Sequence, residues 1–112
     1  MRSERERLLD IQEAITRIEK YANLGKDAFL QDELIQNWII SQIAIIGEAC
    51  RALPEEFQSK YANVPWADIV AMRNIVIHHY FGIDVEAVWS VVVRDIPNLK
   101  ANVFQILADI DE

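Results

Sequence analysis

Apolar residues near the start of the chain recur at intervals of three and four positions. In an α-helix with 3.6 residues per turn, such positions fall on one stripe, so the spacing predicts an amphipathic helix over residues 4–24. Gly25 follows this stretch and is expected to form its C-cap, because glycine tolerates the left-handed conformation in which helices commonly end. The predicted stripe consists of Leu8, Ile11, Ile15, Ile18 and Ala22.

A second stretch, residues 32–53, carries apolar residues on more than one side of its predicted helix. That distribution indicates either a central helix that contacts several neighbours or a helix that forms a subunit interface. Pro54 ends the stretch because proline lacks a backbone N–H, and Pro54-Glu55-Glu56 is typical of the first turn of a short helix. The apolar positions are Leu34, Ile35, Trp38, Ile39, Ile45, Ile46 and Ala49.

Two further helices are expected in the second half of the chain. The first begins at Trp66 and ends at Gly82, a second glycine suited to a C-cap. The other begins after Asp84, whose carboxylate is a good N-cap acceptor. Pro97 interrupts this last stretch and predicts a kink or two consecutive helices, ending near residues 108–110.

Length and composition fit this set of elements. The chain has 112 residues, 52% of them hydrophobic, with only three glycines and three prolines. These values predict one domain over residues 1–112 and leave little sequence for long irregular loops. The predicted fold class is therefore all-α, an up-down bundle of four long helices plus a short one.

The sequence shows no sign of export or membrane insertion. Its start is densely charged and lacks the apolar segment of a signal peptide, and no apolar run is long enough to span a bilayer. Cys50 is the only cysteine, which excludes an internal disulfide, and its apolar neighbours predict a buried side chain rather than a reactive thiol. We therefore expect a cytoplasmic protein without membrane contacts.

The net charge of −7 weighs against a non-specific nucleic-acid binder, because such proteins are basic. Binding to DNA is therefore not expected. Any activity on RNA requires a local basic patch, formed within one subunit or assembled from two.

The candidate chemistry is concentrated in residues 73–80 (RNIVIHHY), which contain both histidines of the chain. On a helix, Asn74 and His78 are four residues apart and share a side, so the amide can orient the imidazole. Arg73 and Tyr80 are two turns apart and share another side. Arg73 and His78 are separated by about 140° around the axis, so one straight helix directs them differently. Two copies about a two-fold axis, or a loosened turn at the helix end, would bring them together.

Arginine and histidine suit RNA cleavage without a metal ion. Histidine titrates near neutral pH and can take the proton of a 2′-hydroxyl or give one to the leaving oxygen. A guanidinium stabilises the negative charge of the phosphorane through paired donors. Adjacent histidines diverge on a helix and no acid stands at ligand spacing, so the pattern does not indicate a metal site. Spacing alone favours structural or solvent-facing roles for such residues over catalysis.

The same segment resembles the Arg-x4-His-x-Tyr motif of HepT-like toxins in the HEPN superfamily, with Arg73, His78 and Tyr80 at its fixed positions. The resemblance extends in order along nearly the whole chain, which makes it far more specific than the motif alone. It includes Ile11-Gln12-Glu13-Ala14-Ile15 through Tyr21, Ile46-Gly47-Glu48-Ala49, Val64-Pro65-Trp66, Met72-Arg73-Asn74, Val88-Trp89 and Asp95-Ile96-Pro97-Asn98-Leu99.

The resemblance implies a homodimeric HEPN-type bundle with the motif at the dimer interface. It makes Arg73 and His78 the catalytic pair of a metal-independent endoribonuclease, with Asn74 as the polar residue that accompanies the arginine. Tyr80 matches the tyrosine to which a minimal nucleotidyltransferase, the antitoxin, attaches AMP and so silences the toxin. The implied substrate is RNA, with tRNA the expected target, and no cofactor is implied.

One position departs from the family pattern. The residue between the histidine and the tyrosine is commonly small, and here it is His79. A second imidazole would compete for the catalytic role, crowd the cleft or add positive charge for RNA. His79 is therefore counted as a supporting site residue.

Two other interpretations stay open. In one, the chain is a catalytically idle HEPN protein that binds nucleotides or serves as a scaffold for the nucleotidyltransferase. The acidic charge favours this interpretation, whereas the intact Arg73, His78 and Tyr80 favour the nuclease. In the other, the polar cluster is only a subunit interface of a helical interaction module, and Arg73→Ala would weaken dimers and affect nothing else.

Overall fold

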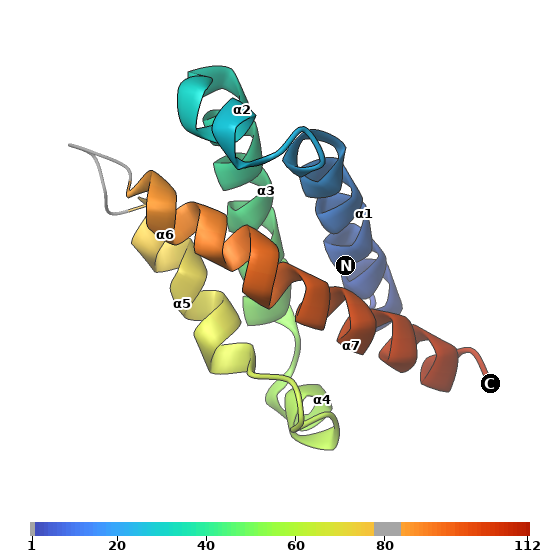
Figure 1. Cartoon of the computed structure of the whole chain (residues 1–112). Helices are drawn as coiled ribbons and strands as arrows, with labels where there is room; N and C mark the ends of the chain where they lie inside the picture. Colours follow the sequence, from blue (N-terminus) through green and yellow to red (C-terminus); the bar gives the residue numbers. More distant parts are fainter. Residues whose placement is uncertain (1, 78–83) are drawn as a thin grey trace.

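The structure, a computed structural model, describes residues 2–77 and 84–112 and is helical over most of this range (Figure 1). At residues 73 and 75–77 it describes the backbone alone. The predicted all-α bundle is confirmed, with three long helices followed by a long C-terminal helical run. The described elements are α1 (Glu4–Ala22), α2 (Lys26–Gln31), α3 (Glu33–Ala52), α4 (Glu55–Lys60), α5 (Trp66–Ile77), α6 (Val85–Ser90), the π-helical turn η1 (Val91–Asp95) and α7 (Ile96–Ile110).

Helix α1 begins with a capping box. The Ser3 hydroxyl accepts from the Glu6 N–H at 3.1 Å, and the Glu6 carboxylate accepts from the Ser3 N–H at 3.0 Å. The predicted apolar stripe faces the core. The predicted C-cap is wrong, because Asn23 caps the helix and its N–H donates to the Glu19 carbonyl at 3.0 Å. Gly25 instead leads into α2 with a φ of +98°, a conformation that glycine adopts without steric cost.

Helix α2 is a second short helix that the sequence pattern did not predict. Its Phe29 is fully buried and packs against Trp89 of α6, with ring centroids 5.2 Å apart. Gln36 of α3 satisfies carbonyl groups near the C-terminal end of α2. Its Nε2 donates to the carbonyl oxygens of Phe29 and Leu30, at 2.9 and 3.2 Å. Six residues are too few to show a periodicity, so tertiary contacts rather than a repeating pattern define this helix.

Helix α3 is the central helix and packs against both α1 and α5 (Figure 1). Asp32 caps its start, and its carboxylate accepts from the Leu34 N–H at 2.9 Å. One side of α3 faces the core, where Cys50 is fully buried, as predicted. Burial raises the pKa of the Cys50 thiol to about 12, which makes it a poor nucleophile. The other side of α3 is exposed, although Leu34, Trp38 and Ile45 lie there.

Helices α4 and α5 begin where the sequence predicted them to begin. Pro54 immediately precedes α4, as its sequence suggested. Trp66 begins α5, and its indole Nε1 donates to the carbonyl oxygens of Tyr61 and Gln58 at 3.0 and 3.2 Å. These bonds fix the point at which α5 starts. The predicted end of this helix, at Gly82, lies outside the described residues.

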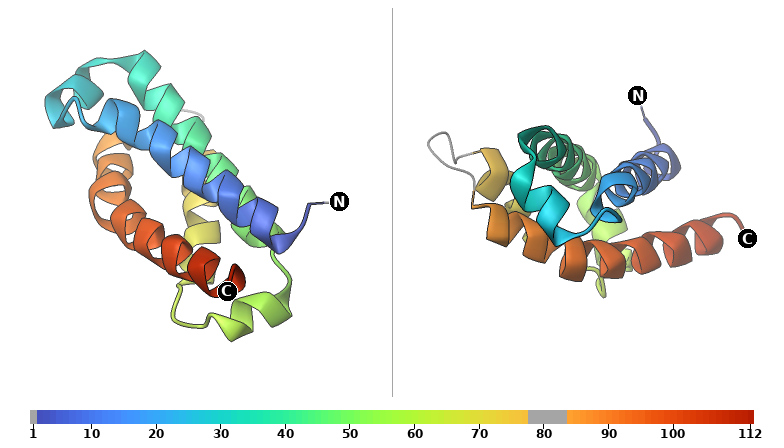
Figure 2. Two further views of the ribbon diagram at one scale, coloured as in Figure 1. Left: turned by 90° about the vertical axis from the view of Figure 1, so that its right-hand side faces the viewer. Right: turned by 45° about the horizontal axis from the view of Figure 1, so that its top comes forward.

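The C-terminal run α6–η1–α7 extends along one side of the bundle (Figure 2). Asp84 caps α6 as predicted, and its carboxylate accepts from the Ala87 N–H at 3.1 Å. The predicted interruption at Pro97 takes the form of the π-helical turn, in which the Ile96 N–H donates to the carbonyl of Val91, five residues earlier. The wider turn precedes the point where the proline ring would otherwise clash with the carbonyl four residues before it.

Candidate functional site

Helix α5 carries the first two residues of the predicted site, Arg73 and Asn74. One side of this helix is buried through Trp66, Ile69 and Met72, and the helix packs against α3. Because these three residues are spaced three apart, they fix the rotation of α5 about its axis. Asn74 lies on the opposite, exposed side of the helix. Its amide is therefore accessible to a substrate or to a neighbouring polar group.

The remaining predicted site residues, His78, His79 and Tyr80, lie outside the described residues. The predicted pairings of Asn74 with His78 and of Arg73 with Tyr80 therefore stay predictions. The described helices on either side of this segment, α5 before it and α6 after it, both bury residues in the core.

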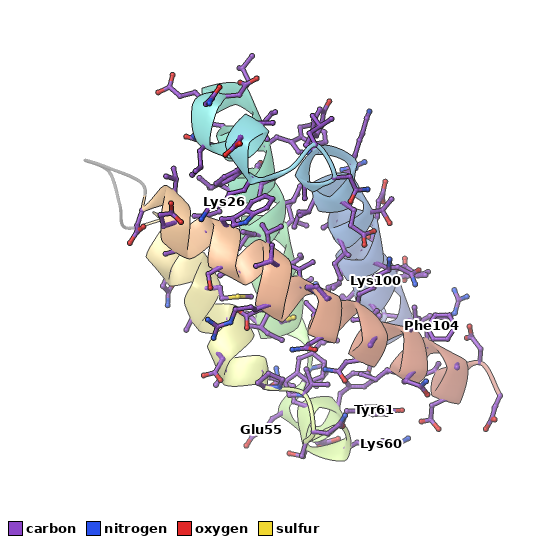
Figure 3. The ribbon with its side chains drawn as sticks, viewed as in Figure 1. Lys26, Glu55, Lys60, Tyr61, Lys100 and Phe104 are labelled. Carbon is purple, nitrogen blue, oxygen red and sulfur yellow. The ribbon has the colours of Figure 1, made fainter. Side chains whose placement is uncertain are left out.

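Helix α6 is held in place by α2 through two contacts. Phe29 packs against Trp89. Lys26, which is labelled in Figure 3, places its Nζ 3.0 Å from a carboxylate oxygen of Glu86. Residues 78–83 join α5 to the N-cap of α6, so α2 positions the far end of the candidate site. Sequence reasoning missed this role. The available signal was Phe29, a large aromatic residue standing a few positions before the N-cap of α3.

Positive charge on the described residues next to the candidate site is sparse. Between residues 84 and 95, Arg94 is the one cationic side chain. It is exposed, and its Nη1 lies 3.4 Å from the Ser90 hydroxyl oxygen. Lys26 is paired with Glu86, which offsets its charge. A basic surface for RNA therefore depends on Arg73, on the motif histidines or on a second copy of the chain.

Neither a metal cluster nor a membrane span is found in the part of the chain that the structure describes. No three histidine, cysteine, aspartate or glutamate side chains lie close enough there to hold a metal ion, although both histidines fall outside this set. Among the same residues, no helix combines the length and the apolar character needed to cross a bilayer.

Comparison with known families adds the observation that decides the identity of the family. The family described as ribonuclease HepT-like matches residues 11–106. This range extends from α1 into α7 and includes the whole segment 73–80. The chain belongs to the ribonuclease HepT-like family. This confirms the family expected from the sequence, and the all-helical HEPN-type fold agrees with it.

Three HepT-like relatives show how far the similarity extends. A Methanocaldococcus jannaschii protein named as a putative RNase is 39% identical over 105 residues, which are 93% of this chain and 87% of the relative. A probable ribonuclease HepT of Thermococcus cleftensis is 40% identical over 100 residues, 88% of this chain and 91% of the relative.

The third relative is longer than this HepT-like chain. It is a Methanocaldococcus jannaschii protein named as a gamma-glutamylcyclotransferase and putative RNase, 41% identical over 103 residues. The match covers 91% of this chain and 46% of the relative, so the chain spans about half of that protein. No solved structure matches the chain.

Proposed function

We propose that this HepT-like protein is a metal-independent endoribonuclease and the toxin of a toxin–antitoxin pair, acting in the cytoplasm as a homodimer. The observation that carries the proposal is that the family match includes the whole motif from Arg73 to Tyr80, with its three fixed residues present. The exposed Asn74 on α5 supports it, because a substrate can reach that side of the helix. The relatives named as ribonucleases support RNA as the substrate class, and tRNA is the expected target.

RNA cleavage at this site needs two proton transfers and one centre of positive charge. The 2′-hydroxyl loses its proton and its oxygen bonds to phosphorus, while the bond from phosphorus to the 5′-oxygen breaks and that oxygen gains a proton. His78 takes part in these transfers, because imidazole accepts and donates protons near neutral pH. Arg73 binds the phosphate and stabilises the charge of the phosphorane.

Asn74 and His79 support the catalytic pair, Arg73 and His78. Asn74 orients the neighbouring imidazole through its side-chain amide, which the four-residue spacing to His78 allows on a helix. His79 supplies a second imidazole in the motif, which shares the proton transfers or adds positive charge that attracts RNA.

The nucleotidyltransferase antitoxin silences this site through Tyr80. The Tyr80 hydroxyl loses its proton to solvent and its oxygen bonds to the α-phosphorus of ATP, while the bond from that phosphorus to the oxygen that bridges it to the β-phosphorus breaks. AMP is then attached to the tyrosine, and pyrophosphate leaves. The attached phosphate carries negative charge into the motif, and the nucleotide occupies space beside Arg73. RNA is then excluded both by repulsion and by bulk.

A catalytically idle partner of the nucleotidyltransferase is the second candidate. The observation that favours it is the net charge of −7, because an acidic chain attracts RNA poorly. In that role the chain binds a nucleotide or the nucleotidyltransferase and cuts no RNA.

The deciding experiment incubates the purified protein with pooled tRNA in excess chelator. We expect cleavage by the wild type and none by Arg73→Ala or His78→Ala, with circular dichroism showing that both variants keep their helices. Arg51→Ala is the matched control, because Arg51 is an exposed arginine at the end of α3, and it should cleave as the wild type does. Undiminished cleavage by both motif variants would overturn the site assignment. A wild type that cuts no RNA would favour the idle partner.

A further inference from the structure

A small cleft lies between α5 and α7, apart from the motif residues described above. Its volume is about 110 Å³, well below the roughly 300–1,000 Å³ of pockets for drug-sized ligands, so it suits a group the size of one heterocyclic ring system. The buried part of its lining is apolar and consists of Ile69, Met72 and Leu99, which are 4%, 7% and 2% exposed. A flat ring that rests on these residues is favourably removed from water.

The rim of the cleft is polar and carries two kinds of hydrogen-bonding group. Asp68 of α5 and Asp95, the last residue of η1, supply carboxylates, and Asn98 and Asn102 of α7 supply amides. A carboxylate only accepts hydrogen bonds, whereas an amide both donates and accepts them. None of these four side chains forms a hydrogen bond or an ion pair with the rest of the described chain, so all four are available to a ligand.

This lining disfavours ions as the occupant. Two carboxylates repel a phosphate group, and no lysine, arginine or histidine of the described chain lines the cleft. A cation such as Ca²⁺ takes about six to eight oxygen ligands, whereas the base of this cleft is apolar. No three acidic, histidine or cysteine side chains of the described residues gather closely enough to hold a metal ion. A neutral ring with apolar faces and polar edges suits both parts of the lining.

Guanine is the nucleobase whose Watson–Crick edge fits this rim best. Its N1–H and its 2-amino group are neighbouring donors that one carboxylate accepts together, and its O6 accepts from an amide. Adenine and cytosine each present one donor group on that edge, and uracil presents one N–H between two carbonyl oxygens. These three bases place an acceptor opposite a carboxylate oxygen, which leaves both atoms without a donor and costs free energy.

Both elements that form the cleft lead into the candidate site. Met72 is followed on α5 by Arg73, and the end of the helix at Ile77 is about 7.5 Å further along its axis, at 1.5 Å per residue. On the other side, the helical run leads from Asp95 back to Asp84, which directly follows residues 78–83. A nucleotide whose base lies in the cleft therefore has its neighbours within reach of the motif.

Arg94 supplies positive charge beside the cleft. It directly precedes Asp95 and stands one turn before Asn98. Its Nη1 lies 3.4 Å from the Ser90 hydroxyl oxygen, so its guanidinium extends toward α6 and the motif segment. No carboxylate of the described chain pairs with it. Its guanidinium is thus available to bind the phosphate of a nucleotide whose base occupies the cleft.

We propose that the cleft between α5 and α7 binds a guanine base of the RNA substrate, through the two aspartates and two asparagines of its rim, with Arg94 on the adjoining phosphate. This deepens the proposed function, on which it rests for RNA as the substrate, by naming the base near which the protein cuts. Hydrogen bonds and apolar contacts to a base require no excess of positive charge, so a chain with a net charge of −7 can make them.

Isothermal titration calorimetry of the full chain tests which base binds. We expect guanosine monophosphate (GMP) to bind about tenfold or more tightly than the monophosphates of adenosine, cytidine and uridine. Inosine monophosphate lacks only the 2-amino group, and we expect it to bind about ten- to hundredfold more weakly than GMP, the cost of one hydrogen bond to a charged acceptor. Equal affinities for all five nucleotides overturn the proposal. So does the absence of GMP binding.

The variants Asp68→Asn and Asp95→Asn test whether the cleft is the binding site. Each replaces an acceptor oxygen by a donor amide of similar size, so the variant whose carboxylate pairs with guanine should lose the preference for GMP over AMP. Asp27→Asn is the matched control, because it makes the same change at an exposed position of α2, and it should keep the preference. A preference kept by both cleft variants, with helices intact by circular dichroism, overturns the proposal. So does Ca²⁺ binding that both variants lose in a chain without guanine preference.

Arg94→Ala separates the phosphate contact from the base contact. We expect this variant to bind GMP more weakly than the wild type and guanosine equally well, because guanosine has no phosphate. Arg51→Ala is the matched control, since Arg51 is an exposed arginine at the end of α3, and it should bind GMP as the wild type does. An Arg94→Ala variant with unchanged GMP affinity contradicts the phosphate contact.

Sequencing of the cut ends of a mixed RNA pool tests whether the guanine belongs to the substrate. The wild type should show guanine enriched at one fixed position near the cut. The cleft variant that loses the GMP preference should still cut but lose this enrichment. Selective GMP binding without enrichment at the cut ends assigns the cleft to a free guanine nucleotide and overturns the RNA subsite.

The two proposals fail in different ways. A protein that binds GMP selectively but cuts no RNA contradicts the proposed nuclease, and the guanine site stands in the binding assay. A protein that cuts RNA without any preference for guanine contradicts the subsite and leaves the nuclease intact.

Discussion

The ring of Phe29 packs against the ring of Trp89, with centroids 5.2 Å apart, and this contact ties α2 to the start of the C-terminal helical run. The ion pair between Lys26 and Glu86 joins the same two elements at the surface. Helix α2 thus positions α6. It also positions Asp84, the N-cap of α6, which directly follows residues 78–83 of the candidate site.

Loss of the Phe29 ring should destabilise the whole protein. Phe29 is fully buried, so Phe29→Ala removes its contacts and leaves a cavity, and we expect the free energy of unfolding to fall by about 3–5 kcal/mol. Urea denaturation followed by circular dichroism measures this change. Phe104→Ala is the control, because its exposed ring should contribute within about 0.5 kcal/mol. Equal losses in the two variants would contradict the packing role of Phe29.

Gln36 should stabilise the fold through its side-chain amide. Its Nε2 donates to two carbonyl oxygens at the end of α2, so Gln36→Leu leaves these acceptors without that donor. We expect the free energy of unfolding to fall by about 1–3 kcal/mol, measured by thermal unfolding. Gln105→Leu, at an exposed position of α7, serves as the comparison and should unfold close to the wild type. A Gln36→Leu variant as stable as the wild type would show that the bonds contribute little.

Tyr80 should be the acceptor of AMP without being needed for cleavage. Tyr80→Phe removes the oxygen to which AMP is attached and keeps the ring, so we expect this variant to cut tRNA and to resist silencing. Mass spectrometry after incubation with the nucleotidyltransferase and ATP measures the added AMP. AMP found on the variant, or on another residue of the wild type, would count against the assignment.

The stability of the protein should decline at alkaline pH because of Cys50. Burial raises the pKa of its thiol from the usual value of 9.0 to about 12, so the unfolded chain ionises before the folded one does. The contribution of the neutral buried thiol is complete below pH 9 and is lost as the pH rises toward 12. The stability difference between the wild type and Cys50→Ala, measured by urea denaturation, should therefore shrink above pH 9. A difference that stays constant would contradict the raised pKa.

Helix boundaries set by side-chain chemistry were predictable from the sequence. Asp32 and Asp84 cap the helices that follow them, and Pro54 lies between α3 and α4. These positions depend on a residue and its immediate neighbours. Helix α2 was not predictable in this way, since Phe29 finds its partner about sixty residues further along the chain. The end of α1 was misjudged because Asn23 takes the cap two residues before the glycine.

The sequence left open whether α3 is a central helix or forms a subunit interface. The structure shows that it packs against both α1 and α5, as a central helix does. Ile39 and Ile46 of this central helix face the core, whereas Leu34 and Ile45 are exposed on its opposite side. The candidate site was less predictable, because its chemistry depends on how Arg73 approaches a histidine in space. Spacing along one helix does not supply that relation. The resemblance to a family did, and the structure adds the anchored helix that carries the first part of the motif.

The π-helical turn determines the phase of the last helix. Four residues of an α-helix advance about 40° beyond a full turn, so the two successive four-residue steps from Val88 through Val92 to Ile96 would carry the third side chain well away from the first. The wider π turn takes up that excess, and all three residues are buried. An ordinary α-helical path through residues 91–95 would instead rotate everything that follows by about 80° relative to α6. The apolar side of α7, from Leu99 to Ile106, would then turn away from the core it now covers.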